Sequence, residues 1–393
     1  MQNCTHGTIW SSVEEVIRSQ VQDFIQSVLE DELTNVLQRT RYQRGGSGHR
    51  NGHRERRILT TFGPIEVSVP RARLVQDSQE LEFRSSLIPK SRRLTRNVEA
   101  LIVSTYLCGV STRRSAIALG QALGPGVTKS TVSRCMDSLM PEWEAFQKRD
   151  LSSDDIQRLI VDGTYIDVRI DKKSTKMTVL VAMGVRKNGD RVILAFKEMA
   201  RESKAAWAEV LEDLSSRGMA CPEVVVTDGS KGLEAALFEI WPLALVQRCT
   251  VHKERNLLAH APENLHQELK DDYQGMMYAP SAEEALAARQ IFLEKWRSKC
   301  PAVAKSLEEA GDKLFTFLRF DPVQWKSLRT TNAIERLNEE FRRRVKVQGL
   351  QPSGQSACML FWALFASGAV QLNKVTGYRT LNQPVGKPIE IAA

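Results

Sequence analysis

The chain has 393 residues, of which 42% are hydrophobic and 26% are charged, and its formal net charge at pH 7 is +8. Its length allows two or three domains, and its composition is that of an ordinary soluble protein. We expect no membrane-spanning segment and no signal peptide, because neither a long apolar run nor a charged-then-apolar N-terminus is present in the sequence. Seven scattered cysteines favour a reducing cytoplasm over a disulfide framework. The positive charge favours phosphate-bearing partners, although a merely basic protein has the same balance.

The first 90 residues predict a long helix, a basic loop and a hairpin. Apolar residues at helical spacing predict one amphipathic helix over 11–38, which serves either packing within its own domain or dimerisation. Residues 41–57 are rich in glycine and arginine and lack apolar periodicity. We therefore expect a flexible basic loop for backbone phosphates, with Arg50 and Arg54 as contacts, and a solvated linker is the alternative. Alternating apolar residues predict a hairpin over 58–74.

Two short helices joined by a glycine turn are predicted between residues 91 and 150. The turn lies at 124–126, and the second helix begins with polar and basic residues. This arrangement resembles a helix-turn-helix, whose second helix places its N-terminal residues in a DNA groove, but a plain helical hairpin has the same pattern. The candidate DNA contacts here are Lys129, Ser130, Thr131 and Arg134.

After a polar hinge at 151–155, strands and helices alternate. The predicted strands span 158–168, 176–185, 191–198, 224–228 and 243–247, and the predicted helices span 203–217 and 230–240. Asn188-Gly189 is a strong hairpin turn between the second and third strands. The order β-β-β-α-β-α-β predicts one mixed sheet, in which the first and fourth strands can be neighbours.

Two of these apolar strands each contain or end in an Asp-Gly pair, Asp162-Gly163 and Asp228-Gly229. An ionised carboxylate in an apolar strand is costly unless positive charge meets it, and the following glycine leaves room for a ligand. A strand-end aspartate bonded to a turn is the alternative for either one. The repetition indicates that two carboxylates meet at one edge of the sheet.

A helical stretch then interrupts the α/β pattern. Helices are predicted over 282–299 and 302–320, so we interpret 257–325 as an all-α insertion in a catalytic core formed by 151–256 and 326–375. A final apolar helix is predicted over 358–370. We expect a flexible tail over 376–393.

The helix predicted over 325–346 has a third carboxylate at the sheet edge. Glu335, Asn338 and Arg342 share one stripe of this amphipathic helix, which we expect to be capped near residue 331 or 332. Glu335 can therefore extend over the edge of the sheet. Glu339, one turn further on, competes with it for this role.

Three carboxylates from two strands and a helix can hold two divalent cations. Oxygen ligands select Mg²⁺ or Mn²⁺, and two such ions about 3.5–4 Å apart clamp the attacking and leaving oxygens of a phosphodiester displacement. The predicted catalytic residues and metal ligands are therefore Asp162, Asp228 and Glu335. The sequence has no Walker-type phosphate loop and no Gly-x-Ser-x-Gly elbow.

The segment 247–256, QRCTVHKERN, places Cys249 and His252 three positions apart. They would form half of a zinc site, for which only His260 and His266 are loosely placed, and a core cysteine with a helix histidine fits the spacing better. The basic and amide residues around the pair suit a DNA backbone. The candidate contacts here are Arg248, Arg255 and Asn256.

Taken in order, these motifs resemble the bacterial mutator-type transposases of insertion sequences. The residues that support the resemblance are Asp162-Gly163, Asp228-Gly229, Cys249-x-x-His252 with Arg255-Asn256, Thr330-Thr331-Asn332-Ala333-Ile334-Glu335-Arg336, Arg50-Asn51-Gly52-His53-Arg54 and Gly109-Val110-Ser111-Thr112-Arg113. The similarity runs from about residue 50 to about residue 369. His53 departs from it, because tyrosine is more usual there.

The resemblance implies an α/β fold with an RNase H-like catalytic core, an all-α insertion and a preceding, mainly helical DNA-binding region. It also implies an Asp-Asp-Glu triad, matched by Asp162, Asp228 and Glu335, and a role in DNA contacts for Cys249 and His252. Asn338 and Arg342 are expected to contact DNA beside the triad.

The expected function is that of an insertion-sequence transposase, which binds terminal inverted repeats through residues 1–150 and cleaves and joins DNA with Mg²⁺ or Mn²⁺. We expect double-stranded DNA as a partner, a homodimer or higher oligomer, no membrane, no small-molecule cofactor and a place in the bacterial cytoplasm. An RNase H-like nuclease that does not join strands and a transposase-derived DNA-binding regulator are the alternatives. Excision by cut-and-paste and copying through a circle are both compatible with the sequence, and the resemblance favours the circle.

Overall fold

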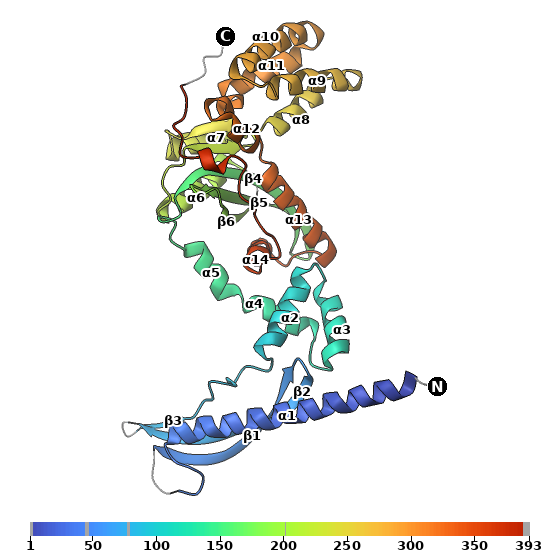
Figure 1. The fold of residues 1–393 in the computed structure, drawn as a ribbon, viewed down its shortest axis with the longest axis vertical. Coiled ribbons are helices and arrows are strands. Elements are labelled where there is room, and N and C mark those ends of the chain that lie inside the picture. The colour runs from blue at the N-terminus through green and yellow to red at the C-terminus, as the bar shows by residue number, and fades with distance from the viewer. Residues whose placement is uncertain (1–2, 44–46, 77–78, 201, 388–393) are drawn as a thin grey trace. The chain divides into compact units, whose positions relative to one another are not determined.

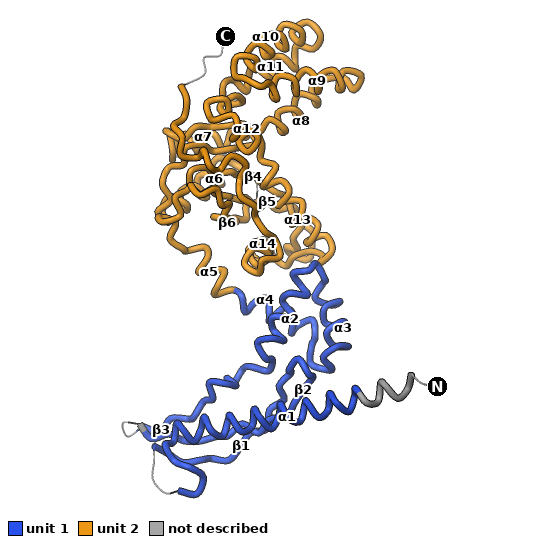
Figure 2. Tube along the Cα trace, viewed as in Figure 1, with its two compact units in different colours: residues 1–139 blue, residues 140–393 orange. Residues whose placement is uncertain are grey.

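The computed structural model describes residues 3–43, 47–76, 79–200 and 202–387, with side chains of the first helix from Trp10 onward. The chain divides into two compact units, residues 1–139 and 140–393, which Figure 2 shows in different colours. The finer division inferred from the sequence stays a prediction. Within the described residues, no helix is long and apolar enough to cross a membrane.

Unit 1 combines helices with a three-stranded antiparallel sheet. Its elements are α1 (Asn3–Leu37), β1 (Gly48–Thr60), β2 (Gly63–Gln76), β3 (Gln79–Glu82), α2 (Arg96–Leu107), α3 (Thr112–Leu123) and α4 (Lys129–Asp137). The second half of α1 packs along the sheet, as Figure 1 shows, where Leu29 meets Ile65 and Val67. The predicted helix over 11–38 is therefore present and uses part of its apolar face within its own unit.

The flexible loop predicted for 41–57 is wrong over most of its length. Residues 48–57 belong to β1, which pairs antiparallel with β2 from Gly48 opposite Leu74 to Thr60 opposite Gly63. The side chains of this segment are mostly exposed, so the strand shows no apolar alternation in the sequence. Its order comes from hydrogen bonding to β2, whose inward side chains are apolar. Residues 44–46 of the predicted loop lie outside the described residues.

The predicted helix pair is present as α3 and α4. Both helices begin at a capping residue: Ser111 accepts a hydrogen bond from the amide of Arg114, and Thr128 accepts one from the amide of Thr131. Gly124, between the helices, has a φ of +83°, which favours glycine over residues with a side chain. The first turn of α4 therefore has a defined start.

Unit 2 is built on a five-stranded mixed sheet in the order β6-β5-β4-β7-β8. The strands are β4 (Ile156–Ile170), β5 (Lys173–Arg186), β6 (Arg191–Met199), β7 (Val224–Thr227) and β8 (Leu245–Arg248). The first three form an antiparallel meander, whereas β7 pairs parallel with both β4 and β8. The prediction that the first and fourth strands are neighbours is confirmed.

Helices cover both faces of this sheet (Figure 1). The helices of unit 2 are α5 (Met140–Lys148), α6 (Lys204–Ser216), α7 (Lys231–Ile240), α8 (Thr250–His260), α9 (His266–Met277), α10 (Ala282–Lys299), α11 (Pro301–Ala310), α12 (Pro322–Leu328), α13 (Asn332–Gln348) and α14 (Gly354–Ala366), with short 3₁₀ turns at Glu263–Leu265, Gly311–Leu314, Thr316–Arg319 and Tyr378–Thr380. On one face, Trp207 of α6 and Leu237 of α7 pack on Val161. On the other, Phe341 of α13 stacks on Phe361 of α14 with ring centroids 3.9 Å apart. Burial on both faces explains the near-continuous apolar runs of β4 and β5.

The helix predicted over 325–346 is two helices, α12 and α13, with a break at residues 329–331. Long-range contacts make this break. Arg329 donates to the carbonyl of Met277 at 2.5 Å and lies over the ring of Tyr278, while the buried Thr331 contacts Cys249. The amphipathic pattern continues across the break, so the sequence could not locate it. The second helix begins at 332, where the cap was expected.

The tail predicted for 376–393 is packed as far as the structure describes it. Leu381 is buried, the side chain of Gln324 donates to the carbonyl of Thr380 at 2.6 Å, and the amide of Gly386 donates to the carbonyl of Arg319 at 2.7 Å. These contacts come from residues more than fifty positions earlier, so the local sequence gives no sign of them. Residues 388–393 lie outside the described part.

Candidate active site

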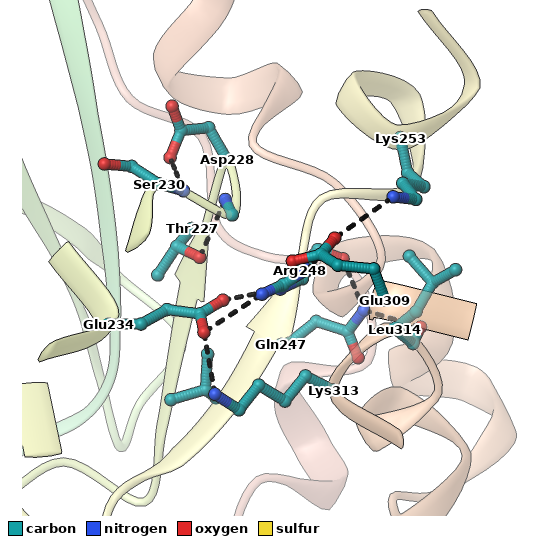
Figure 3. A network of polar contacts seen from close by, with 12 residues as sticks. Thr227, Asp228, Ser230, Glu234, Gln247, Arg248, Lys253, Glu309, Lys313 and Leu314 are labelled. Carbon is teal, nitrogen blue, oxygen red and sulfur yellow. Dashed lines mark hydrogen bonds and ion pairs between the residues drawn. The ribbon is translucent and has the colours of Figure 1, made fainter. Parts of the chain in front are cut away.

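The parallel pairing of β4 and β7 sets the position of both predicted catalytic aspartates. The last paired residues of the two strands are Ile160 and Val226. Asp162 and Asp228 each lie two positions further along, so the register brings them to the same level on neighbouring strands. Ser230 fixes Asp228, because its amide donates to Asp228 Oδ1 at 2.9 Å (Figure 3).

Asp162 lies in the middle of a buried strand and is only 8% exposed. Burial raises its pKa to about 6, Asp228 and Glu335 add to this rise, and His252 opposes it. Asp228 and Glu335 are therefore both close enough to Asp162 to influence its ionisation. Asn338 Nδ2 donates to Asp162 Oδ2 at 2.8 Å.

Glu335 lies in the first turn of α13 and meets two cations of α8. Its Oε1 atom is 2.9 Å from Arg255 Nη1 and 3.2 Å from His252 Nε2. Glu339 is exposed and is not among the groups that shift the pKa of Asp162. The geometry thus favours Glu335 over Glu339 as the third carboxylate.

The Cys-x-x-His pair links the start of α8 to the start of α13. Cys249 is fully buried, and its Sγ accepts hydrogen bonds from the amide and the hydroxyl of Thr331 at 3.4 and 3.3 Å. Although burial raises the pKa of the Cys249 thiol, its interactions with His252 and Thr331 outweigh burial and lower it. The interaction with Cys249 raises the pKa of His252 to about 9. His252 is therefore a cation between Cys249 and Glu335.

Arg248 and Cys249 are both buried in this structure, and the DNA contacts predicted for them stay predictions. The Arg248 guanidinium forms ion pairs with Glu234 at 2.5 Å and Glu309 at 3.0 Å, as Figure 3 shows, and its side chain is nearly buried. Lys313 also pairs with Glu234, at 2.7 Å. This network joins β8 and α7 of the sheet layer to the helical stretch. The glutamates of this network are far from Arg248 in the sequence. The basic composition of residues 248–255 therefore gave no sign that Arg248 has acidic partners.

The other predicted DNA contacts of unit 2 differ in their surroundings. Arg255 and Arg342 are exposed, although Arg255 also pairs with Glu335. Asn256 is exposed and accepts a hydrogen bond from the hydroxyl of Ser306 at 2.7 Å. Asn338 is buried and donates to Asp162, and the DNA contact predicted for it stays a prediction.

Three carboxylates and a buried amide oxygen are the groups that fit a divalent cation. As the side chains stand, no group of three or more His, Cys, Asp or Glu residues in the described part of the chain could hold a metal ion. Glu335 faces the cations of α8 instead. The Oδ1 atom of Asn338, beside Asp162, is a buried acceptor with no hydrogen-bond partner among the described residues. Hard oxygen donors of this kind are those that Mg²⁺ and Mn²⁺ prefer.

Comparison with known proteins identifies the family. The sequence matches the family model "Transposase, Mutator family" over residues 2–374. The chain belongs to the mutator family of transposases. It is 33% identical over 317 residues to the transposase for insertion sequence element ISRM5 of Rhizobium meliloti, covering 81% of this chain and 78% of that protein. It is 30% identical over 338 residues to the transposase for IS256 in transposon Tn4001 of Staphylococcus aureus, covering 84% of each, and 32% identical over 321 residues to the transposase for IS1081 of Mycobacterium tuberculosis, covering 81% of this chain and 76% of that one.

Unit 1 contains a cavity of about 1210 Å³, which we call the basic groove. It lies between the β1–β2 hairpin, the segment before α2 and helix α4. The cations that line it include Arg54, Arg56, Arg57, Arg84, Arg93 and Arg134. Arg56 donates to the carbonyls of Ile88 and Pro89 at 3.0 Å each, and burial together with neighbouring Arg54 and Arg93 lowers its pKa. The groove therefore concentrates positive charge.

The sequence located only part of this groove. Arg54, Thr131 and Arg134 line it, whereas Lys129 and Ser130 are exposed on α4 outside its lining. Arg50 turns instead toward α1, where it pairs with Glu30 at 2.7 Å. The groove cations of the segment before α2, Arg92 and Arg93, were missed, although two adjacent arginines were a visible signal.

Replacing Asp162 by asparagine is expected to stabilise the fold above pH 6. The folded-state pKa is raised, so between about pH 4 and pH 6 the folded chain holds a proton that the unfolded chain releases, and stability falls as pH rises through this window. Asp162→Asn should therefore raise the free energy of unfolding by about 1–3 kcal/mol at pH 7 and by little at pH 4. Urea unfolding without divalent cations measures this difference. The control is Asp167→Asn, which alters an exposed aspartate of the same strand, and an equal gain at both pH values would contradict the expectation.

Replacing Arg248 by methionine is expected to lower the stability of unit 2 and to leave the DNA affinity of the folded variant unchanged. Arg248→Met leaves nearly buried Glu234 with Lys313 as its remaining cation, and we expect the free energy of unfolding to fall by about 2–3 kcal/mol. Adding Glu234→Leu should recover most of this loss. Urea unfolding and DNA titration of the folded variants measure the two effects. Unchanged stability with weaker DNA binding would support the DNA contact predicted for Arg248.

Proposed function

We propose that this chain is the transposase of an insertion sequence, which binds terminal inverted repeats and cleaves and joins DNA by an Asp-Asp-Glu mechanism. The observation that supports this best is the register of β4 and β7, which brings Asp162 and Asp228 to the same level on neighbouring strands, with Glu335 near enough to raise the pKa of Asp162. Membership of the mutator family makes DNA the expected substrate. An antiparallel meander followed by parallel strands, with a helical stretch before the glutamate, is the order expected of an RNase H-like core.

Mg²⁺ or Mn²⁺ at the three carboxylates would activate water or a 3′-hydroxyl and stabilise the charge on the departing oxygen. The carboxylates suit such a cation because Asp228 and Glu335 both disfavour the ionisation of Asp162, and a positive ion between the three would favour it. Asn338 orients Asp162, and the Ser230 amide orients Asp228. We expect two ions, as in other sites of this chemistry.

Glu335 must leave its present partners before it can act as a ligand. Its carboxylate is paired with Arg255 and His252, both from α8. Once released, these two cations lie beside the carboxylates, where they can hold the phosphates that flank the reacting bond. Arg342, exposed two turns after Glu335 on α13, can extend this contact. The same cations thus balance Glu335 in the free protein and the DNA backbone in the complex.

The basic groove of unit 1 is the proposed contact surface for the inverted repeats. Its arginines neutralise backbone phosphates, which supplies affinity without sequence reading. Lys129 and Ser130, exposed in the first turn of α4, supply side chains that can reach base edges. Phosphate and base contacts would then come from adjacent elements of one unit.

An end-cleavage and strand-transfer assay tests the proposed function. The substrate is a labelled duplex with the terminal repeat of the element, incubated with Mg²⁺. We expect joined products from the wild type and from Glu339→Gln, and none above background from Asp162→Asn, Asp228→Asn or Glu335→Gln. Cleavage without joining would favour a nuclease. Repeat binding with no metal-dependent product from the wild type would favour a regulator.

Neutralising arginines of the basic groove should weaken duplex binding and make it less sensitive to salt. Each lost phosphate contact lowers the slope of log K against log salt by about 0.9, so the triple variant Arg54→Gln, Arg57→Gln, Arg93→Gln should lower it by about 2–3. Fluorescence anisotropy at several salt concentrations measures the slope. The matched control, Arg39→Gln, Arg41→Gln, Arg73→Gln, removes the same charge from unit 1 outside the groove. Equal losses in both variants would show that net charge alone is responsible.

A further inference from the structure

Asn338 is the second side chain that α13 brings to the carboxylates. It lies three positions after Glu335, on the same face of the helix, and is only 2% exposed. Its Nδ2 atom donates to Asp162 Oδ2 at 2.8 Å, across 176 positions of sequence. One helix therefore holds a carboxylate and an amide over the same edge of the sheet.

The other end of this amide has no partner. Asn338 Oδ1 is buried, and none of the described residues donates a hydrogen bond to it. Leaving a buried acceptor unsatisfied destabilises the fold, and a leucine of similar size would fill the same space without that cost. The reverse orientation of the amide would place its oxygen against the carboxylate of Asp162. The carboxylate of Asp162 therefore selects the orientation in which the NH₂ group of Asn338 faces it, and this orientation leaves the amide oxygen without a partner.

We propose that Asn338 is a positioning residue for Asp162 and supplies a neutral oxygen to the divalent-cation site. The inference rests on the metal-dependent function proposed above. Amide oxygens are ordinary ligands of hard cations, either directly or through water. A neutral donor adds to the number of ligands without a fourth negative charge, in a place where three carboxylates already repel one another.

A role in packing alone makes the opposite demands on this position. Leucine would satisfy packing and remove both the donor and the acceptor, whereas aspartate would keep oxygen atoms but place a second carboxylate beside Asp162. The two substitutions therefore distinguish the two roles. Under the proposal, Asn338→Leu loses cation affinity and Asn338→Asp keeps it.

Direct binding of Mn²⁺ to the full-length chain tests the proposal. Electron paramagnetic resonance of the free ion gives the Kd for the wild type, Asn338→Leu, Asn338→Asp, Asp162→Asn and the control Glu339→Gln, without DNA. We expect Asn338→Leu to weaken binding at least about tenfold and Asn338→Asp to stay near the wild type. Thermal unfolding in chelator should show that Asn338→Leu is folded. If it is not, Asn338→Ala, which also lacks the amide, takes its place.

The outcomes separate this inference from the proposed function. Wild-type affinity in Asn338→Leu, together with loss in Asp162→Asn, would overturn the role of Asn338 and leave the metal site in place. Loss of binding in Asn338→Asp with retention in Asn338→Leu would assign the position to packing. No Mn²⁺ binding by the wild type, or binding that is indifferent to Asp162→Asn, would overturn the metal site itself and this inference with it.

Discussion

The parallel pairing of β4 with β7 is the constraint on which the candidate active site depends. It fixes the levels of Asp162 and Asp228 through backbone hydrogen bonds, so neither position relies on a flexible side chain. A register shift of one residue on either strand would turn its aspartate to the other face. Such a shift would also move Leu159 and Val161, which pack on α6 and α7, to the opposite face of the sheet. The stability of the sheet and the geometry of the carboxylates are therefore one property.

Charge balance is the second organising principle of the site. Negative charge comes from the sheet edge and from α13, and positive charge comes from His252 and Arg255 on α8. The buried Cys249 strengthens the cationic form of His252, which gives the Cys-x-x-His spacing a role in this charge balance. Below the site, Arg248 neutralises two acids and joins the sheet to α11 (Figure 3).

Local patterns in the sequence located the candidate catalytic carboxylates, and distant contacts account for most of what the sequence did not show. Strand ends and helix stripes are local, so Asp162, Asp228 and Glu335 could be located from them. Asn338 and Arg248 were assigned to DNA because their stripes and neighbours are polar, yet their partners lie up to 176 positions away. The arginine-rich β1 was missed because its side chains are mostly exposed and show no apolar alternation. The apolar residues that this sheet buries belong mostly to β2.

The helical stretch between β8 and α13 begins and ends at neighbouring positions beside the sheet. The position of Glu335 therefore does not depend on the length of this stretch. The amide of Thr250 donates to the carbonyl of Arg329 at 2.8 Å, and Cys249 accepts from Thr331, so both ends of the stretch are joined directly beside the sheet. Thr331 is also the residue from which α13 starts, one turn before the glutamate. Any number of helices can be accommodated between these two ends without moving Glu335. The buried cysteine is thus best understood as part of the joint that places the third carboxylate.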